Sequence, residues 1–325
     1  MKKTAPIYRQ LLRDAWSVTW ERKSLWVFGL LAGMISTGGV VDVAISGMRR
    51  AALAGSLFKN LLDQSFIGYA YASQFFLQLQ KIDPREATGF FTVVVLVIIG
   101  LVCTGIISQA ALIHGSGATH LPPYLLRRHV LPHFWNVLLI DLATKAISVM
   151  LIFVTSLPVF SFLLQRDGLS SSVLFLHFLI FIPTIIILHI LSMLALVATV
   201  EKNQGVLASI EQAWDLFRRQ WLATLEYGFL LFLIVLIGGL LLAAALTLGA
   251  IPYGALYALA ATSGSIPLFF TINTLSALGV LILLFLFGSV AITFQYSAWR
   301  QFYKRAEHRT FGQRTFSKIR RTLFA

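Results

Sequence analysis

The chain has 325 residues, of which 58% are hydrophobic and only 12% are charged. Soluble domains carry roughly 25% charged residues, so this composition excludes a water-soluble globular protein. The net charge of +13 fits basic residues that flank apolar segments, and the single Cys103 excludes a disulfide framework within one chain.

Residues 1–24 predict an amphipathic helix that stays on the cytoplasmic side. This stretch is too long and too polar for the first region of a signal peptide. Its apolar residues recur at helical spacing on one stripe: Ile7, Leu11, Leu12, Ala15 and Trp16.

Six stretches are apolar enough to cross a membrane, because a transmembrane helix needs ~20 such residues. They are Leu25 to Ile45, Phe90 to Ile113, Val137 to Leu164, Val173 to Val200, Leu222 to Leu248 and Phe270 to Thr293. Gly29 and Gly33 in the first stretch have a spacing that permits close helix packing. We therefore predict an all-α polytopic membrane protein with one membrane domain, whose spans occupy residues 25–298.

The connections differ in character. The segment Gly47 to Thr88 predicts helices in the outer interface, and Gly115 and Gly117 end the second span. The segment Ile251 to Pro267 predicts a link broken by glycine and proline. Residues 299–325 form a basic tail.

Basic residues gather before the first span, in the segment Glu201 to Trp221 and in the tail. By the positive-inside rule, both termini are then cytoplasmic, in the inner cell membrane. A tryptophan-bearing amphipathic segment precedes each pair of spans, around Trp16, Trp135 and Trp214. This pattern predicts three hairpins, each preceded by a cytoplasmic interfacial helix, and a weak internal repeat.

The segment Glu201 to Trp221 is a charged island between apolar runs. Read as one helix, it has an apolar stripe, formed by Val206, Ile210, Ala213, Trp214, Phe217 and Trp221. Asp215 lies three and four residues before Arg218 and Arg219, so it can pair with either. The pattern predicts a cytoplasmic interfacial surface made of Trp214, Phe217, Arg218, Arg219 and Trp221.

Ionisable residues inside a span are often functional. Asp141 and Lys145 lie one turn apart in the third span, which favours a structural ion pair and leaves a transport role as the alternative. The tail residues Arg300, Lys304 and Arg305 are candidate contacts for anionic lipid headgroups.

Histidines cluster around the link after the second span, at His114, His120, His129 and His133. Pro132 interrupts the helix that a metal site at His129 and His133 would need, so interfacial histidines are the favoured interpretation. His177 and His189 share the fourth span but fall on different faces. No phosphate loop occurs, which argues against an ATPase, and no G-x-S-x-G elbow is present. We expect no metal or cofactor, and no nucleic-acid partner because the basic residues flank apolar segments and no soluble module is visible.

Three segments resemble one family. They are Lys23 to Leu31 with the preceding Tyr8 to Trp16, the central Glu201 to Trp221, and Tyr296 to Tyr303. The group is the six-span membrane domain found attached to some glycerophosphoryl diester phosphodiesterases and in related bacterial and archaeal membrane proteins. The resemblance implies the six-span fold over nearly the whole chain. It implies no phosphodiesterase activity, because that chemistry resides in a separate soluble barrel.

The favoured function is a non-enzymatic membrane scaffold or lipid-interacting protein. Its partners would be anionic lipid headgroups on the cytoplasmic side, another membrane protein or a second copy of the chain. The alternatives are a transporter with a polar path through Asp141, Lys145, His177, His189 and Glu226, and an intramembrane lipid enzyme.

Overall fold

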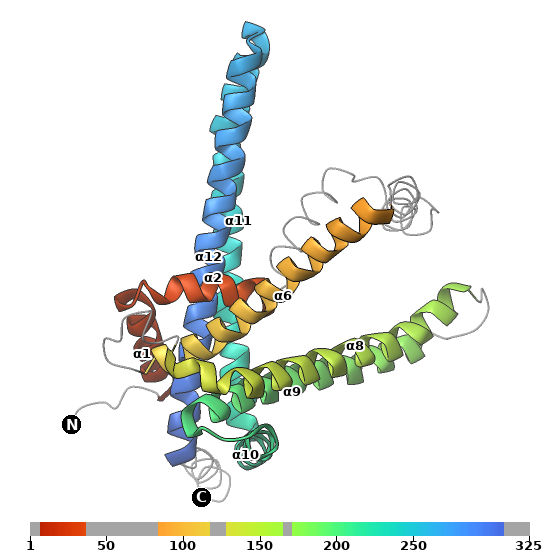
Figure 1. Cartoon of the computed structure of the whole chain (residues 1–325), viewed down its shortest axis with the longest axis vertical. Helices are drawn as coiled ribbons and strands as arrows, with labels where there is room; N and C mark the ends of the chain where they lie inside the picture. The colour runs from red at the N-terminus through yellow and green to blue at the C-terminus, as the bar shows by residue number, and fades with distance from the viewer. Residues whose placement is uncertain (1–6, 37–83, 118–127, 165–170, 309–325) are drawn as a thin grey trace, which may run out of the picture. The chain divides into compact units, whose positions relative to one another are not determined.

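The computed structural model describes residues 7–36, 84–117, 128–164 and 171–308. This part of the chain is all-α, without strands (Figure 1). Its elements are α1 (Ile7–Glu21), α2 (Leu25–Ser36), α6 (Pro84–Gly115), the 3₁₀ turn η1 (Leu131–His133), α8 (Phe134–Leu164), α9 (Ser171–Lys202), α10 (Val206–Arg219), α11 (Trp221–Ser263) and α12 (Ile266–His308).

Five helices in these ranges are long and apolar enough to cross a membrane. They are α6, α8, α9, α11 and α12, and their outward surfaces are dominated by exposed apolar side chains. This is the architecture of a multi-pass helical membrane protein. The first predicted span begins with α2, and its second half lies outside the described residues, as do the predicted outer segment up to residue 83 and the tail beyond His308.

The chain forms two compact units. One comprises Met1–Leu30 with Ile106–Ala325, and the other comprises Leu31–Gly105. In the second unit, the structure describes the end of α2 and most of α6, which exposes Phe90, Val93 and Leu96. The candidate site described below lies in the first unit.

The prediction of a broken link between the last two spans is wrong. α11 continues through Pro252 to Ser263, and α12 begins at Ile266. Only Gly264, with a left-handed φ of 63°, reverses the chain. Each helix has 43 residues, which at 1.5 Å per residue gives roughly 64 Å, about twice the hydrocarbon thickness of a bilayer.

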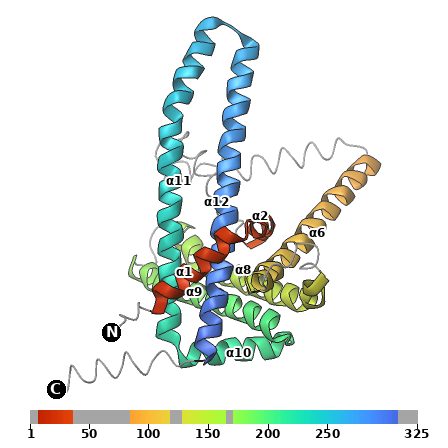
Figure 2. The same cartoon turned by 90° about the vertical axis from the view of Figure 1, so that its left-hand side faces the viewer.

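Figure 2 shows α11 and α12 side by side, with α1 across the lower part of α12 and α10 below α9. The rings of Trp16 in α1 and Phe294 in α12 meet at a centroid distance of 5.7 Å. We call this region the base: α1 packs against α12 near Phe294, and α10 packs against α9 and α11.

Gly29 makes a close helix crossing possible at the base. A methyl group placed there would lie 2.4 Å from the backbone oxygen of Ser289 and from the hydroxyl of Thr293. The Thr293 hydroxyl donates to the Leu25 carbonyl at 3.3 Å. The glycine therefore lets α2 approach α12 within backbone contact.

The central charged segment is not one helix. α9 ends at Lys202, Asn203 adopts a left-handed φ of 53°, and α10 covers only Val206–Arg219. Asparagine tolerates this conformation better than most residues. A second break at Gln220 places Trp221 at the start of α11 rather than on the α10 stripe.

Candidate functional site

A buried ion-pair cluster lies at the centre of the base. Glu201, near the end of α9, accepts from Arg300 Nε through one carboxylate oxygen and from Lys304 Nζ at 3.0 Å through the other. The side chain of Arg300 is only 8% exposed and that of Glu201 is 17% exposed. A buried guanidinium is costly unless it is paired, so this contact fixes α12 against α9.

The end of α6 closes over this cluster. A methyl group placed on Gly117 would lie 1.7 Å from the nearest guanidinium nitrogen of Arg300. Arg22, between α1 and α2, donates to the Gly115 carbonyl. Gly117 thus makes room for the Arg300 side chain, and the backbone carbonyl of Gly115 accepts from Arg22.

An aromatic layer packs beside the cluster. Tyr227 stacks on Phe302 at 4.7 Å and meets Trp299 edge-on at 5.7 Å. The Tyr227 hydroxyl donates to the Ala298 carbonyl at 3.0 Å. Large buried rings of this kind contribute much apolar area to a core, and here they hold the lower ends of α11 and α12 together.

Tyr8 connects α1 to α11. Its hydroxyl donates to a carboxylate oxygen of Glu226 at 3.0 Å. Burial, followed by the hydrogen bond and the charge of Glu226, raises the pKa of Tyr8 well above its usual range. The hydroxyl therefore stays protonated and keeps donating at neutral pH.

α10 carries three different surfaces. Ser209, Ala213 and Phe217 are buried against the base, while Arg218 and Arg219 are exposed. Between these faces lies an apolar flank of Leu207, Ile210 and Trp214, which is exposed, Trp214 by 51%. The predicted stripe is therefore split: Ala213 and Phe217 pack inward, and Trp214 does not. Asp215 contacts Arg219 at 3.8 Å rather than Arg218.

α1 repeats this arrangement. Ala15 and Ala213 are both buried, and the tryptophan after each is exposed to a similar extent, 48% for Trp16 and 51% for Trp214. Successive side chains of a helix point about 100° apart, so the residue after a buried alanine lies on the adjacent flank. Two of the three predicted repeats thus share a geometry. In the third, Trp135 is exposed at the start of α8, and residues 118–127 before it lie outside the described part.

Asp141 and Lys145 form an ion pair within α8. Glu226 is bonded to Tyr8, and His189 is exposed on α9. Among the described residues, no hydrogen bond or ion pair joins the Asp141–Lys145 pair to His189 or to Glu226. The side chain of His177 is not among those described.

The three predicted lipid contacts of the tail have different environments. Arg300 is buried and paired with Glu201, contrary to the prediction that it meets lipid headgroups. Lys304 is exposed but also contacts Glu201, and Arg305 donates to the side-chain oxygen of Gln10 at 3.3 Å. Residues 299–308, predicted as the start of a tail, continue α12 into the base.

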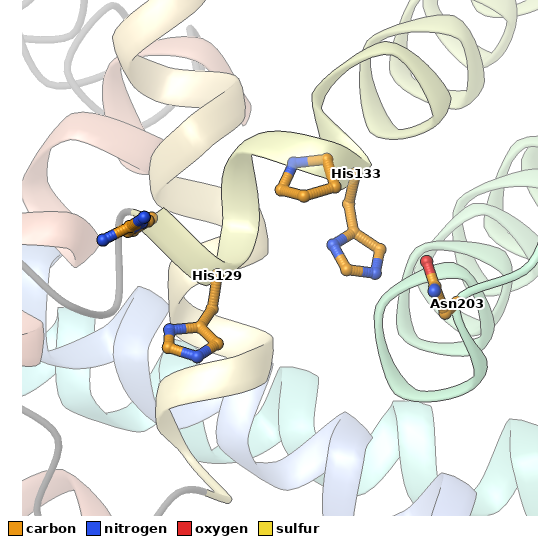
Figure 3. A pocket seen from close by; sticks show the side chains of 5 residues that line it. His129, His133 and Asn203 are labelled. Atoms are coloured by element: carbon orange, nitrogen blue, oxygen red, sulfur yellow. The ribbon is translucent and has the colours of Figure 1, made fainter.

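A cavity of about 560 Å³ opens beside η1, lined by Arg128, His129, Pro132, His133 and Asn203 (Figure 3). The rings of His114 and His129 stack at 6.0 Å with an interplanar angle of 10°. No group of three or more metal-ligating side chains occurs among the described residues. His120 lies outside them.

Sequence reasoning missed the contact of Glu201 with Arg300, whose positions are 99 residues apart. The only available signal was that both charges border apolar runs, which does not select a partner.

Comparisons with models of known protein families, with curated proteins and with solved structures find no match. The resemblance to the six-span membrane domain therefore stays a prediction.

Proposed function

We propose that the chain is a non-enzymatic scaffold of the inner cell membrane that engages anionic lipids through its cytoplasmic face. In this proposal α2, α6, α8, α9, α11 and α12 provide six spans, arranged as three hairpins. Both termini are cytoplasmic, and α1 and α10 lie in the membrane interface. The base is then the cytoplasmic end of the protein.

The observation that carries the proposal is the exposed apolar flank of α10. Leu207, Ile210 and Trp214 border the charged face that carries Arg218 and Arg219. An interfacial helix places apolar side chains at the boundary of headgroups and acyl chains, and its cations near the phosphates. The three exposed apolar side chains on one flank of α10 match this placement.

The exposed flank of α1 supports placing α1 at the same depth in the membrane interface as α10. Trp16 and Trp20 are exposed next to the buried Ala15 and Thr19. Tryptophan is enriched at membrane–water interfaces because its ring is apolar and its N–H is polar. Since α1 packs on α12 and α10 packs on α9, the two flanks belong to one base.

The ionisable groups of the spans favour the scaffold over the transporter. Asp141 is neutralised by Lys145 within the same helix, and Glu226 is bonded at the base. A transport path needs polar groups that face one another along a common route. The contacts of Asp141 and Glu226 instead satisfy each carboxylate with a neighbouring group.

The lipids retained by the protein test the proposal. We would extract it into native-lipid discs and identify lipids and proteins by mass spectrometry. We expect anionic lipids to be enriched over the bulk membrane, and this enrichment to fall in the variant Trp214→Ala/Arg218→Ala/Arg219→Ala. Phe270→Ala, an exposed aromatic at the other end of α12, is the control. If the triple variant kept all lipid and protein association, the α10 surface would not be the working surface.

A further inference from the structure

The cavity beside η1 is rich in hydrogen-bond donors. Arg128, His129, His133 and Asn203 supply its polar lining, and among the described residues no carboxylate lines it. The nearest acidic residue in sequence to Asn203 is Glu201, whose two oxygens are occupied by Arg300 and Lys304. Guanidinium, imidazole and amide groups together suit an oxyanion.

His133 has no partner for its ring. Both of its nitrogens are buried, and neither forms a hydrogen bond. Buried polar atoms are nearly always satisfied, so each orphan requires a bound group or water. In Figure 3 the ring of His133 points toward Asn203.

A tight turn and a hydrogen bond to its backbone hold two walls of the cavity in place. Asn203 takes its left-handed conformation in the short turn between α9 and α10. Asn136, in the first turn of α8, donates from its side-chain amide to the Gln204 carbonyl at 3.2 Å. The turn that carries Asn203 is thus bonded to the helix that follows His133, which preorganises the two walls.

We propose that this cavity binds a phosphate group, with Arg128, His133 and Asn203 as donors. The inference rests on the proposed function for its depth, because Trp135, two residues after His133, is 68% exposed at the start of α8 and would mark the headgroup level. A phospholipid headgroup and soluble inorganic phosphate offer the same chemistry. The experiment must therefore separate these two sources.

The test uses the full-length protein in detergent micelles. Binding of inorganic phosphate would be measured by calorimetry, and retention of phosphatidylglycerol or phosphatidylcholine by native mass spectrometry. Arg128→Gln and His133→Leu remove donors of the cavity. Arg13→Gln, an exposed arginine on α1, is matched in charge. Asn203→Gly removes a third donor and suits the left-handed backbone at this position. Circular dichroism and gel filtration identify any variant that fails to fold.

We expect each cavity variant to weaken the binding of phosphatidylglycerol at least about tenfold, as for loss of a charge-assisted hydrogen bond, with no change in Arg13→Gln. Competition between inorganic phosphate and phosphatidylglycerol would show that the cavity binds the phosphate group itself. If inorganic phosphate binds with the same variant dependence and lipid retention does not change, the source is soluble phosphate. If the cavity variants bind both probes like the wild type, His133 holds only water and the proposal is overturned. The lipid enrichment attributed to α10 would survive that result, so the two proposals fail separately.

Discussion

Glu201→Gln would leave the buried guanidinium of Arg300 without its counter-charge. The substitution keeps the size and one acceptor of the side chain but removes its negative charge. Because the Arg300 side chain is only 8% exposed, water cannot replace the carboxylate. Breaking a buried pair by removing one partner costs about 3–5 kcal/mol, and we expect the free energy of unfolding to fall by this amount.

Asp215→Asn provides the matched control. It breaks a pair whose side chains are 63% and 73% exposed and whose atoms are 3.8 Å apart, so its cost should not exceed about 1 kcal/mol. Reversible unfolding in mixed detergent micelles, followed by helical circular dichroism, measures both changes. The double variant Glu201→Gln/Arg300→Met should recover most of the loss, since no buried charge remains. Equal losses for Glu201→Gln and Asp215→Asn would refute the role given to the buried pair.

Three further substitutions test the packing of the base. Gly29→Ala should destabilise the protein by about 1–3 kcal/mol through overpacking, whereas Gly288→Ala, with nothing within 4 Å, should be neutral or stabilising in the same unfolding assay. Gly117→Ala must displace the buried side chain of Arg300, so we expect the midpoint temperature of unfolding to fall. A second substitution at Arg300 should reduce this fall, and an unchanged midpoint in Gly117→Ala would contradict the contact. Tyr8→Phe should cost about 0.5–1.5 kcal/mol for the bond to Glu226. Because the pKa of Tyr8 is raised on folding, the stability difference between wild type and Tyr8→Phe should hold below about pH 10 and shrink above it, as a pH series of unfolding curves would reveal.

The long apolar helices could be predicted from composition alone. The stretch from Phe90 to Ile113 lies inside α6, Val137 to Leu164 inside α8, and Val173 to Val200 inside α9. Apolar length determines such helices because a backbone in lipid must satisfy its own hydrogen bonds. The link from Ile251 to Pro267 was mispredicted, since Pro252 is accommodated inside α11 and only Gly264 needs a left-handed backbone.

The interior of the base could not be predicted in the same way. Gly29 lies in a close crossing, but its spacing from Gly33 did not identify α12 as the neighbour. The periodicity of α10 gave an apolar stripe, yet it could not divide that stripe into a buried part at Ala213 and an exposed part at Trp214. Such choices depend on which helix packs against which face, and one helix's pattern does not contain that information.

The depth of the α10 flank in the bilayer tests the proposed interfacial placement most directly. In a Cys103→Ser background, single cysteines at Ile210 and Arg219 would carry nitroxide labels in reconstituted vesicles. We expect the label at Ile210 to collide mainly with oxygen dissolved in lipid, and the label at Arg219 to collide mainly with a water-soluble nickel chelate. Equal access of the chelate to both labels would place α10 in water and contradict the interfacial scaffold.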